Sequence, residues 1–395
     1  MAIISLDNIR FTSYKKFAGS ETLNLRPVTV LIGKNSSGKS SIARLFPMLR
    51  KSLSGQLKGL PLSFSNDGVS LGVSFGNLSH NGVSVGLKFG VTLSSGISID
   101  VTLMATMSGE IVVSDYVLNH NDKTYTLSIK PNNKYYSCRE NGKEYLVSDI
   151  NGFIHRQLFE ELGIGTGFLM PIDYIGPLRI TPERTIYYNR GEGTNYVGTT
   201  GKYAYDMFIQ DEGIRKGVSE WFKRSFDGCS IFPKTMTEQN AYQIMLHKGY
   251  MDGYDVNLVD EGMGMTQVFP IIVRSCMPVQ GSTVVIEQPE LHLHPAAHAE
   301  LARLFARTSK AYSQKYVVET HSETLLMGLR DAVVDPDIDF TPKDVIIYFI
   351  DEDESGAYLR PIEIQEDGVL TDWPEGVFYE NYELLKEIRR KVQQL

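Results

Sequence analysis

Cysteine is scarce in this sequence: Cys138, Cys229 and Cys276 are its only three among 395 residues. Their spacing fits no metal-binding motif and provides no disulfide framework, which is typical of a reducing compartment. Long apolar runs are also missing, since no stretch approaches the roughly 18 consecutive apolar residues of a membrane-spanning helix. The N-terminus lacks the charged and apolar regions of a signal peptide. We therefore expect a soluble cytoplasmic protein with no membrane partner.

An excess of positive charge is absent as well. The 39 lysines and arginines are outnumbered by 47 aspartates and glutamates, which gives a net charge of −8. Without a global basic field, any contact with DNA requires a local basic patch. The sequence also has no internal repeat and no heptad run over 45–275, which excludes a long coiled coil there. What remains is an ordinary globular composition, 42% hydrophobic, with enough chain for a large core.

Strand and helix patterns alternate toward both ends of the chain. An apolar strand pattern at 23–32 ends close to a glycine, and a helical pattern begins after Gly38. This alternation around a strand-rich middle predicts an α/β fold with an inserted antiparallel layer. Further strands are expected at 2–11, 283–287, 315–319 and 344–350, helices at 153–162, 202–226, 264–277, 295–310, 322–333 and 380–395, and a glycine-rich loop at 190–201.

The middle of the chain, 60–150, has a different pattern from its ends. Apolar residues recur there at every second position, and Asn81-Gly82 and Ser95-Gly96 interrupt the alternation. Such dipeptides between alternating segments are typical of β-hairpin turns, so we expect an antiparallel β meander. The alternating apolar positions are Val83, Val85, Leu87, Phe89, Val91 and Leu93.

The strongest motif is GKNSSGKS, from Gly33 to Ser40, which satisfies G-x-x-x-x-G-K-[ST] in full. It follows a predicted strand and opens a predicted helix, as a phosphate-binding P-loop does. Backbone N–H groups would surround the phosphates of ATP, Lys39 would reach the β- and γ-oxygens, and Ser40 would ligate Mg²⁺. The predicted nucleotide-binding residues of this segment are Gly33, Lys34, Asn35, Ser36, Ser37, Gly38, Lys39, Ser40 and Ser41.

The second motif is VVIEQPELHLHP, in which a predicted strand ends at Glu287. A strand-ending acid downstream of a P-loop is the Walker B arrangement, so Glu287 is predicted on the magnesium side. Gln288 then occupies the place of the catalytic carboxylate. A glutamine orients water without accepting its proton, and general-base help contributes about 10²–10⁴-fold, so slow hydrolysis is expected. Two alternatives remain open: Glu290 replaces the missing base, or the register differs by one residue.

Two further segments are candidate site segments because of their position in the chain. In DEGMGMTQ, Gly262 and Gly264 precede a helix whose N-terminus could meet an anion, although by itself this is also an ordinary glycine-rich helix start. In VVETHSE, His321 follows the next predicted strand, 34 residues after Glu287. A lone histidine is more often structural, but this position makes it a candidate catalytic residue.

Together these four segments resemble the ABC-type ATPase heads, in the branch that includes the overcoming-lysogenisation-defect (OLD) proteins and the SMC-like ATPases of prokaryotic defence systems. The resemblance also includes YIGPLR and DWPEGVFYE and covers nearly the whole chain outside 60–150. It implies a P-loop NTPase head in which two copies pair head-to-tail across ATP. It further implies that Gly262, Gly264 and Thr266 touch the γ-phosphate held by the other copy, and that His321 senses it.

The sequence departs from that family in two places. Its signature segment is not LSGGQ, which argues against a transporter subunit. No Q-loop glutamine can be placed, and YIGPLR supplies Arg179 at about that position, a candidate phosphate or dimer contact. The expected divisions are 1–59 and 151–340 for the ATPase head, 60–150 for the inserted meander, and 341–395 for the closing C-terminal strand, loop and helix.

Other functional interpretations of the sequence have weaker support. The His292, His294 and His298 cluster lacks the glutamate of a metalloprotease helix. The acidic segment DEDESG at 351–356 is better explained as a solvated acidic hairpin than as a nuclease site. We expect Trp373 to pack. We expect the basic EIRRKVQQL segment to be a solvated helix end rather than a DNA contact.

The sequence thus predicts an ABC-type ATPase that binds ATP and Mg²⁺, self-associates through its ATP face, and has no nuclease of its own. The resemblance implies control of a partner effector, a nuclease or toxin, in anti-phage defence. Two alternatives are a DNA-repair clamp, which the missing coiled coil weakens, and a nucleotide-gated scaffold with little turnover.

Overall fold

The computed structural model describes residues 4–83, 86–130, 134–188, 196–236, 240–249, 253–373 and 390. Three predicted features fall wholly or partly outside these residues: the helix at 380–395, the start of the glycine-rich loop at 190–201, and the DWPEGVFYE segment beyond Trp373. Among the described helices, none is both long enough and apolar enough to cross a membrane. The helices are α1 (Lys39–Ala43), α2 (Leu45–Leu53), α3 (Arg156–Glu161), α4 (Ala204–Gln210), α5 (Glu212–Ser225), α6 (Met263–Ser275), α7 (Pro295–Ala311) and α8 (Glu323–Val334).

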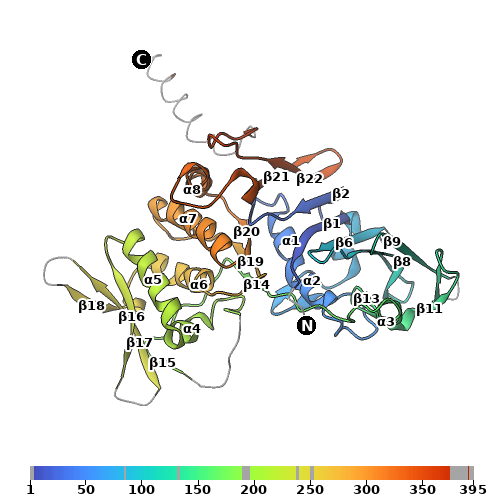
Figure 1. Cartoon of the computed structure of the whole chain (residues 1–395), viewed down its shortest axis with the longest axis horizontal. Helices are drawn as coiled ribbons and strands as arrows, with labels where there is room; N and C mark the ends of the chain where they lie inside the picture. The colour runs from blue at the N-terminus through green and yellow to red at the C-terminus, as the bar shows by residue number, and fades with distance from the viewer. Residues whose placement is uncertain are drawn as a thin grey trace.

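A six-stranded sheet forms the centre of the molecule (Figure 1). Five of its strands are parallel, and the sixth closes one edge as the antiparallel hairpin partner of its neighbour. The central strands are nearly continuous apolar runs, as expected of parallel strands buried on both faces. In spatial order the strands are β14 (Ile172–Ile175), β19 (Thr283–Glu287), β20 (Lys315–Glu319), β3 (Val28–Gly33), β21 (Val345–Asp353) and β22 (Gly356–Ile362).

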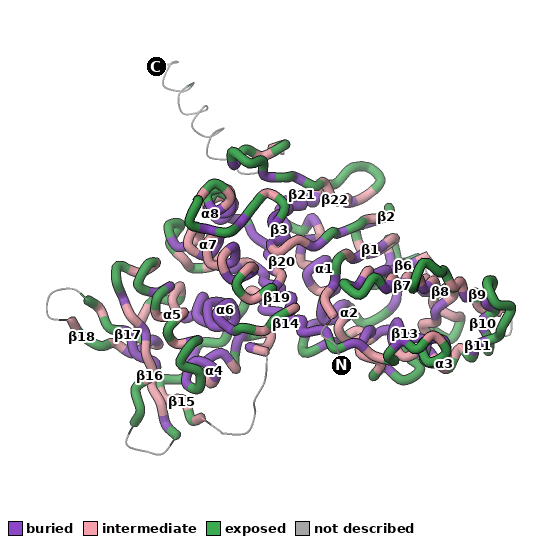
Figure 2. Tube along the Cα trace, viewed as in Figure 1, coloured by how far each residue is buried: buried purple, intermediate pink, exposed green. Residues whose placement is uncertain are grey.

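The two faces of this sheet belong to different hydrophobic cores. Val285 and Val317 lie in a core shared with α1 and α2, whereas Val284 and Val318 lie in one shared with α4 to α8. This division follows from the alternation of side chains along a strand. In Figure 2 the central strands and α6 are mostly buried, and the outer elements around them are more exposed.

The predicted antiparallel layer is present and includes the N-terminal strands. It is an eight-stranded sheet in which β6 pairs with β1, so the inserted strands continue the N-terminal hairpin instead of forming a separate sheet. The mixed α/β fold with an antiparallel layer is therefore confirmed. Its strands, in spatial order, are β11 (Glu144–Leu146), β10 (Tyr135–Cys138), β9 (Lys123–Ile129), β8 (Ile111–His120), β7 (Ser98–Ala105), β6 (Leu87–Leu93), β1 (Leu6–Tyr14) and β2 (Phe17–Asn24).

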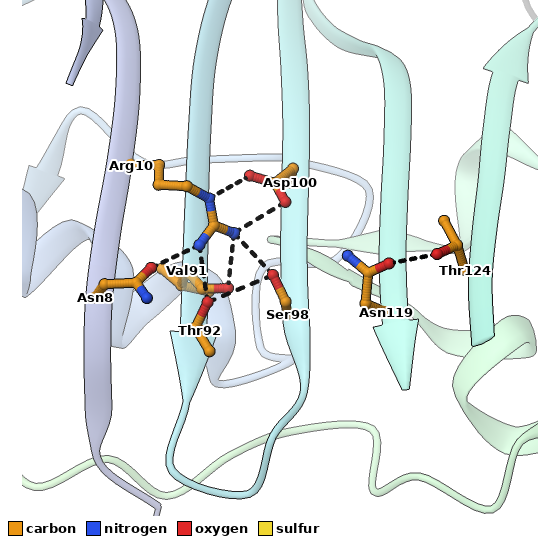
Figure 3. A network of polar contacts seen from close by, with 8 residues as sticks. All are labelled: Asn8, Arg10, Val91, Thr92, Ser98, Asp100, Asn119 and Thr124. Carbon is orange, nitrogen blue, oxygen red and sulfur yellow. Dashed lines mark hydrogen bonds and ion pairs between the residues drawn. The ribbon is translucent and has the colours of Figure 1, made fainter. Parts of the chain in front are cut away.

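A polar network ties β1 to the inserted strands (Figure 3). Arg10 donates to both carboxylate oxygens of Asp100 over 2.9 Å and to Ser98 over 2.8 Å. Gly90 faces this pair, and a side chain there would collide with the Asp100 carboxylate. The network lies on the face of β1 opposite the buried Ile9. It therefore joins strands that are about 90 residues apart in the chain.

The meander prediction is wrong for the first part of its range. Residues 60–86 contain only the two-residue strands β4 (Ser65–Asn66) and β5 (Val69–Ser70) and two short 3₁₀ turns among their described positions. Asn81-Gly82 belongs to one of these turns, not to a hairpin. The segment instead buries Leu71, Phe75 and Leu78 in the core beside α2, which fixes its path by packing rather than by strand pairing.

A second antiparallel sheet, which the sequence analysis did not predict, extends beside α5. It contains β15 (Ile186–Tyr187), β16 (Ser230–Thr235), β17 (Ala241–Lys248) and β18 (Tyr254–Asn257). The remaining strands are β12 (Ile150–Asn151) and β13 (Ile154–His155). At the other end of the molecule, the 351–356 segment forms the tip of the β21–β22 hairpin, as the acidic-hairpin interpretation predicts.

Candidate nucleotide site

The candidate site lies where the parallel strands end. In the sheet, β20 lies between β3 and β19, and Glu319 pairs in register with Glu287 on one side and Leu31 on the other. Parallel strands end at the same edge of a sheet, where ligands of α/β folds bind. The P-loop after β3 and the two strand-ending glutamates therefore meet at this edge.

The P-loop encloses its own lysine. Lys39 is buried, and its Nζ donates to the carbonyl oxygens of Gly33 over 2.8 Å and Lys34 over 2.7 Å. Burial lowers the pKa of Lys39, and the Glu319 carboxylate opposes that shift. Gly33 has φ of 149°, and a side chain there would press against the Ile350 carbonyl of β21. The loop thus needs glycine where it passes closest to the sheet.

A cavity of about 570 Å³ opens in front of this loop. Residues 35–41 form its floor, and Lys15 and Lys16 border it from the β1–β2 turn. Gln288, Glu319 and His321 line it from the ends of β19 and β20. The structure therefore brings together most of the predicted P-loop residues with Gln288 and His321, although they lie about 250 to 280 residues apart in the chain.

Glu319 is the residue that the sequence analysis missed. Its Oε1 accepts a hydrogen bond from Ser40 Oγ over 3.0 Å, and its side chain is only 3% exposed. Burial and the charge of Glu287 raise the pKa of Glu319 to about 7. The signal was present in the sequence, because Glu319 ends its strand as Glu287 does.

Glu287 is held one strand further from the P-loop. The Tyr174 hydroxyl donates to its Oε1, and Arg44 Nε lies 3.8 Å from the same oxygen. Burial raises the pKa of Glu287, while the Tyr174 hydrogen bond and the Arg44 charge oppose the shift. Glu287 is not one of the described residues that line the cavity.

Arg179 lies behind the end of β19 rather than in the cavity. It is 5% exposed, and its Nη2 donates to the carbonyl oxygens of Glu287 over 2.6 Å and Gln288 over 3.1 Å. Burial lowers the pKa of Arg179 to about 10, and the charges of Glu290 and Glu287 limit the shift. In this structure Arg179 positions the backbone that carries the predicted catalytic residues.

The backbone after β19 turns sharply. Gln288 has φ of 47°, and its N–H donates to the Glu319 carbonyl over 2.8 Å. Glu290 Oε1 accepts from the His321 N–H over 2.7 Å. Burial and the charge of Lys39 lower the pKa of His321, which favours its neutral form. Gln288, at the place predicted for the catalytic carboxylate, lines the cavity, whereas Glu290, the alternative base, is engaged with the backbone of the neighbouring loop.

The predicted signature residues lie at the start of α6, outside the described lining of the cavity. Gly262 is exposed, and Gly264 packs so closely on the His292 carbonyl that a side chain there would collide with it. Thr266 is buried, and its hydroxyl donates to Met263 O over 3.0 Å, so it does not face solvent at the helix end. These residues could therefore contact a nucleotide in a P-loop cavity only if that cavity belonged to a second copy of the chain.

The three histidines near α7 have structural roles here. His298 bonds Ser322 Oγ over 2.7 Å and Leu293 O over 3.2 Å, and His294 caps the N-terminus of α7. Throughout the described part of the chain, no three His, Cys, Asp or Glu side chains converge as a metal site. The structure gives no support to a zinc site at this cluster.

The raised pKa of Glu319 predicts that Glu319→Gln stabilises the nucleotide-free protein at alkaline pH. A raised pKa means that folding favours the protonated form, so stability is present below the ordinary value of 4.5 and is lost as the pH rises through about 7. Glutamine removes this loss, which amounts to at most about 3 kcal/mol. We expect urea unfolding to show that the variant has a higher free energy of unfolding than wild type, and that this difference grows from pH 5 to pH 8.

The matched control for this prediction is Glu366→Gln, at an exposed residue beyond β22. Its effect is expected to be small at both pH values. A gain for Glu319→Gln that is equal at pH 5 and pH 8 would contradict the assigned protonation.

Two segments of the chain match known protein families. Residues 208–328 match the family described as "AAA domain, putative AbiEii toxin, Type IV TA system". The match includes α6, β19 and β20 and therefore Glu287, Gln288 and His321. This part of the chain is similar to AAA domains. Residues 340–388 match a second family, described as a protein of unknown function (DUF3696).

Solved structures offer distant likenesses to this chain, and a search of curated proteins finds no match. The SMC head domain from Thermotoga maritima is 15% identical, with 91% of this chain and 100% of that chain covered and a TM-score of 0.45. An Smc head domain bound to the C-terminal domain of ScpA, derived from Pyrococcus furiosus, is 11% identical, with 98% and 100% covered and a TM-score of 0.48.

Proposed function

We propose that this chain binds ATP together with Mg²⁺ in the P-loop cavity and hydrolyses it slowly. The observation that carries the proposal is the convergence of Lys39, Ser40 and Glu319 on one cavity in front of a complete P-loop. The residues fit the ligand, because Ser37 Oγ is buried there without a hydrogen-bond partner among the described residues. Phosphate oxygens would accept from this hydroxyl and from Lys39.

The protein groups at this site have separable tasks. Lys39 and the backbone N–H groups of 35–41 would bind and orient the phosphates, in place of the loop carbonyls that Lys39 now contacts. Bound Mg²⁺ would supply neutralisation of phosphate charge. Neutral His321 would hydrogen-bond the γ-phosphate, and Gln288 would orient a water molecule without accepting its proton.

Gln288 also supports a second candidate, a nucleotide-gated scaffold that holds ATP with little turnover. It lines the cavity at the position predicted for the catalytic carboxylate. A DNA-repair clamp is less well supported, because the longest described helix, α7, has 17 residues and provides no long arm. Measured turnover separates a slow ATPase from a scaffold.

We further propose that two copies pair across ATP, with the α6 N-terminus of each copy completing the cavity of the other. This proposal is supported by the exposure of Gly262 and of Met263, whose side chain is 58% exposed, at an end of α6 that lies outside the same chain's cavity. Apolar side chains exposed beside a functional segment are typical of contact surfaces.

Pairing predicts an ATP-dependent dimer. Light scattering with saturating ATP and Mg²⁺ should give twice the monomer mass, and Met263→Asp should weaken the dimer roughly tenfold by placing a charge in its interface. Met107→Asp, at a fully exposed position in the β7–β8 turn, is the matched control and should dimerise normally. A strictly monomeric mass under these conditions would rule out the pairing.

The ATP state of the dimer is proposed to control a separate effector, a nuclease or toxin, in anti-phage defence. The description of the family matched by 208–328, which names a putative toxin of a toxin–antitoxin system, agrees with such a setting. Purification with and without ATP, followed by identification of the proteins that co-purify, tests this part. Recovery of DNA-repair factors instead would favour the clamp.

A further inference from the structure

Glu319 has an unusual environment for a buried carboxylate. One oxygen, Oε1, accepts from Ser40, but the other, Oε2, has no hydrogen-bond partner among the described residues. Burying a charged group without partners is costly, so such groups are normally paired or coordinate a metal. The adjacent strand ends in a second buried acid, Glu287. Two neighbouring carboxylates at the edge of a phosphate site have the chemistry of a divalent-cation position.

We propose that Glu319 and Ser40 together ligate the magnesium ion that accompanies ATP, an inference that rests on the proposed nucleotide function. Mg²⁺ takes six oxygen ligands at about 2.1 Å, so neighbouring ligands of the octahedron lie about 3.0 Å apart. Ser40 Oγ and Glu319 Oε1 are separated by 3.0 Å. If a bound ion replaced the hydrogen bond between these two oxygens, both could act as adjacent ligands with little movement of their side chains.

Glu287, the acid that the sequence predicts on the magnesium side, is less well placed for direct ligation. It ends the strand beyond β20, so Glu319 lies between it and the P-loop strand. Its Oε1 is already engaged by the Tyr174 hydroxyl and faces Arg44. Glu287 therefore acts on the metal through its neighbours, as a positioning group.

This cation site is incomplete without nucleotide. Within the described residues no third His, Cys, Asp or Glu joins the two glutamates around a common centre. Mg²⁺ commonly combines one or two carboxylates with substrate phosphates and water. The positive charge of Lys39, which lines the same cavity, also disfavours binding of a cation in the absence of nucleotide. The ion should thus bind tightly only when ATP is present.

The test uses Mn²⁺ as a spectroscopic substitute for Mg²⁺ with the full chain. Electron paramagnetic resonance measures Mn²⁺ bound in the protein–ATP complex, and a fluorescent ATP analogue measures nucleotide affinity in EDTA. Glu319→Gln should weaken Mn²⁺ binding at least about tenfold. It should not weaken nucleotide binding in EDTA, because it removes a negative charge that repels phosphate. Retained nucleotide binding also shows that the variant folds.

Two variants complete the experiment. Glu287→Gln should reduce Mn²⁺ affinity less than Glu319→Gln does, and the exposed Glu366→Gln should leave it unchanged. Wild-type Mn²⁺ affinity in Glu319→Gln, or a larger loss in Glu287→Gln, would overturn the inference while leaving the nucleotide function intact. Failure of the wild-type protein to bind the ATP analogue in either medium would instead refute the proposed function itself.

Discussion

Replacement of Lys39 by alanine is expected to weaken ATP binding about 30-fold or more and to abolish the cellular activity of the protein. The Lys39 ammonium lies at the base of the cavity, where its two hydrogen bonds go to loop carbonyls that phosphate oxygens can replace. Removing one partner of a buried charge pair costs about 2–5 kcal/mol. Titration with a fluorescent ATP analogue measures the loss directly.

The matched control is Lys123→Ala, which removes an exposed lysine at the start of β9. Lys123→Ala should unfold near the wild-type temperature, whereas Lys39→Ala should be slightly less stable because it leaves the buried Gly33 carbonyl without this hydrogen bond, and circular dichroism should show it folded at the assay temperature. Lys39→Ala protein that still binds ATP as tightly as wild type, or that remains active in cells, would eliminate the nucleotide-driven hypothesis.

Gln288→Glu is the second large expected effect, an increase of about 100-fold or more in ATP turnover. Gln288 lines the cavity, and glutamate has nearly the same size and shape as glutamine, so it can occupy the same place. It would add the proton acceptor that wild-type protein lacks there, and general-base catalysis contributes about 10²–10⁴-fold. Phosphate release under saturating ATP and Mg²⁺ checks this.

Glu290→Gln serves as the comparison, because Glu290 is the alternative base. Its Oε1 is bonded to the His321 N–H, and its Oε2 is buried without a partner among the described residues. If Gln288 occupies the base position, Glu290→Gln should lower turnover only modestly through His321. Unchanged turnover in Gln288→Glu together with an inactive Glu290→Gln variant would assign the base to Glu290.

Local patterns in the sequence were sufficient for the P-loop and for most of the central strands. A P-loop is a continuous segment whose glycines, lysine and serine act at fixed spacing, so 33–40 could be read without the fold. The strands ending at Glu287 and Glu319 are short apolar runs with clear ends. Neighbouring residues set these features, and no distant contact was needed to recognise them.

Strand pairing and packing between distant segments could not be predicted from local sequence patterns. The β15–β18 sheet was missed because its strands are short and partly polar and are stabilised by one another and by α5. The opposite error occurred at 60–86, where alternation suggested strands but packing of Leu71 and Phe75 beside α2 fixed another path. In both regions tertiary contacts outweighed local preference.

The sequence by itself determined that this protein carries a complete P-loop motif, a strand-ending acid followed by glutamine, and a histidine after the next strand. Only the tertiary structure decided which acid meets the P-loop serine. The strand that ends at Glu319 comes after the Glu287 strand in the chain, yet it lies between that strand and β3 in the sheet. Strand order depends on how helices cross over and pack on the sheet, which no short segment encodes.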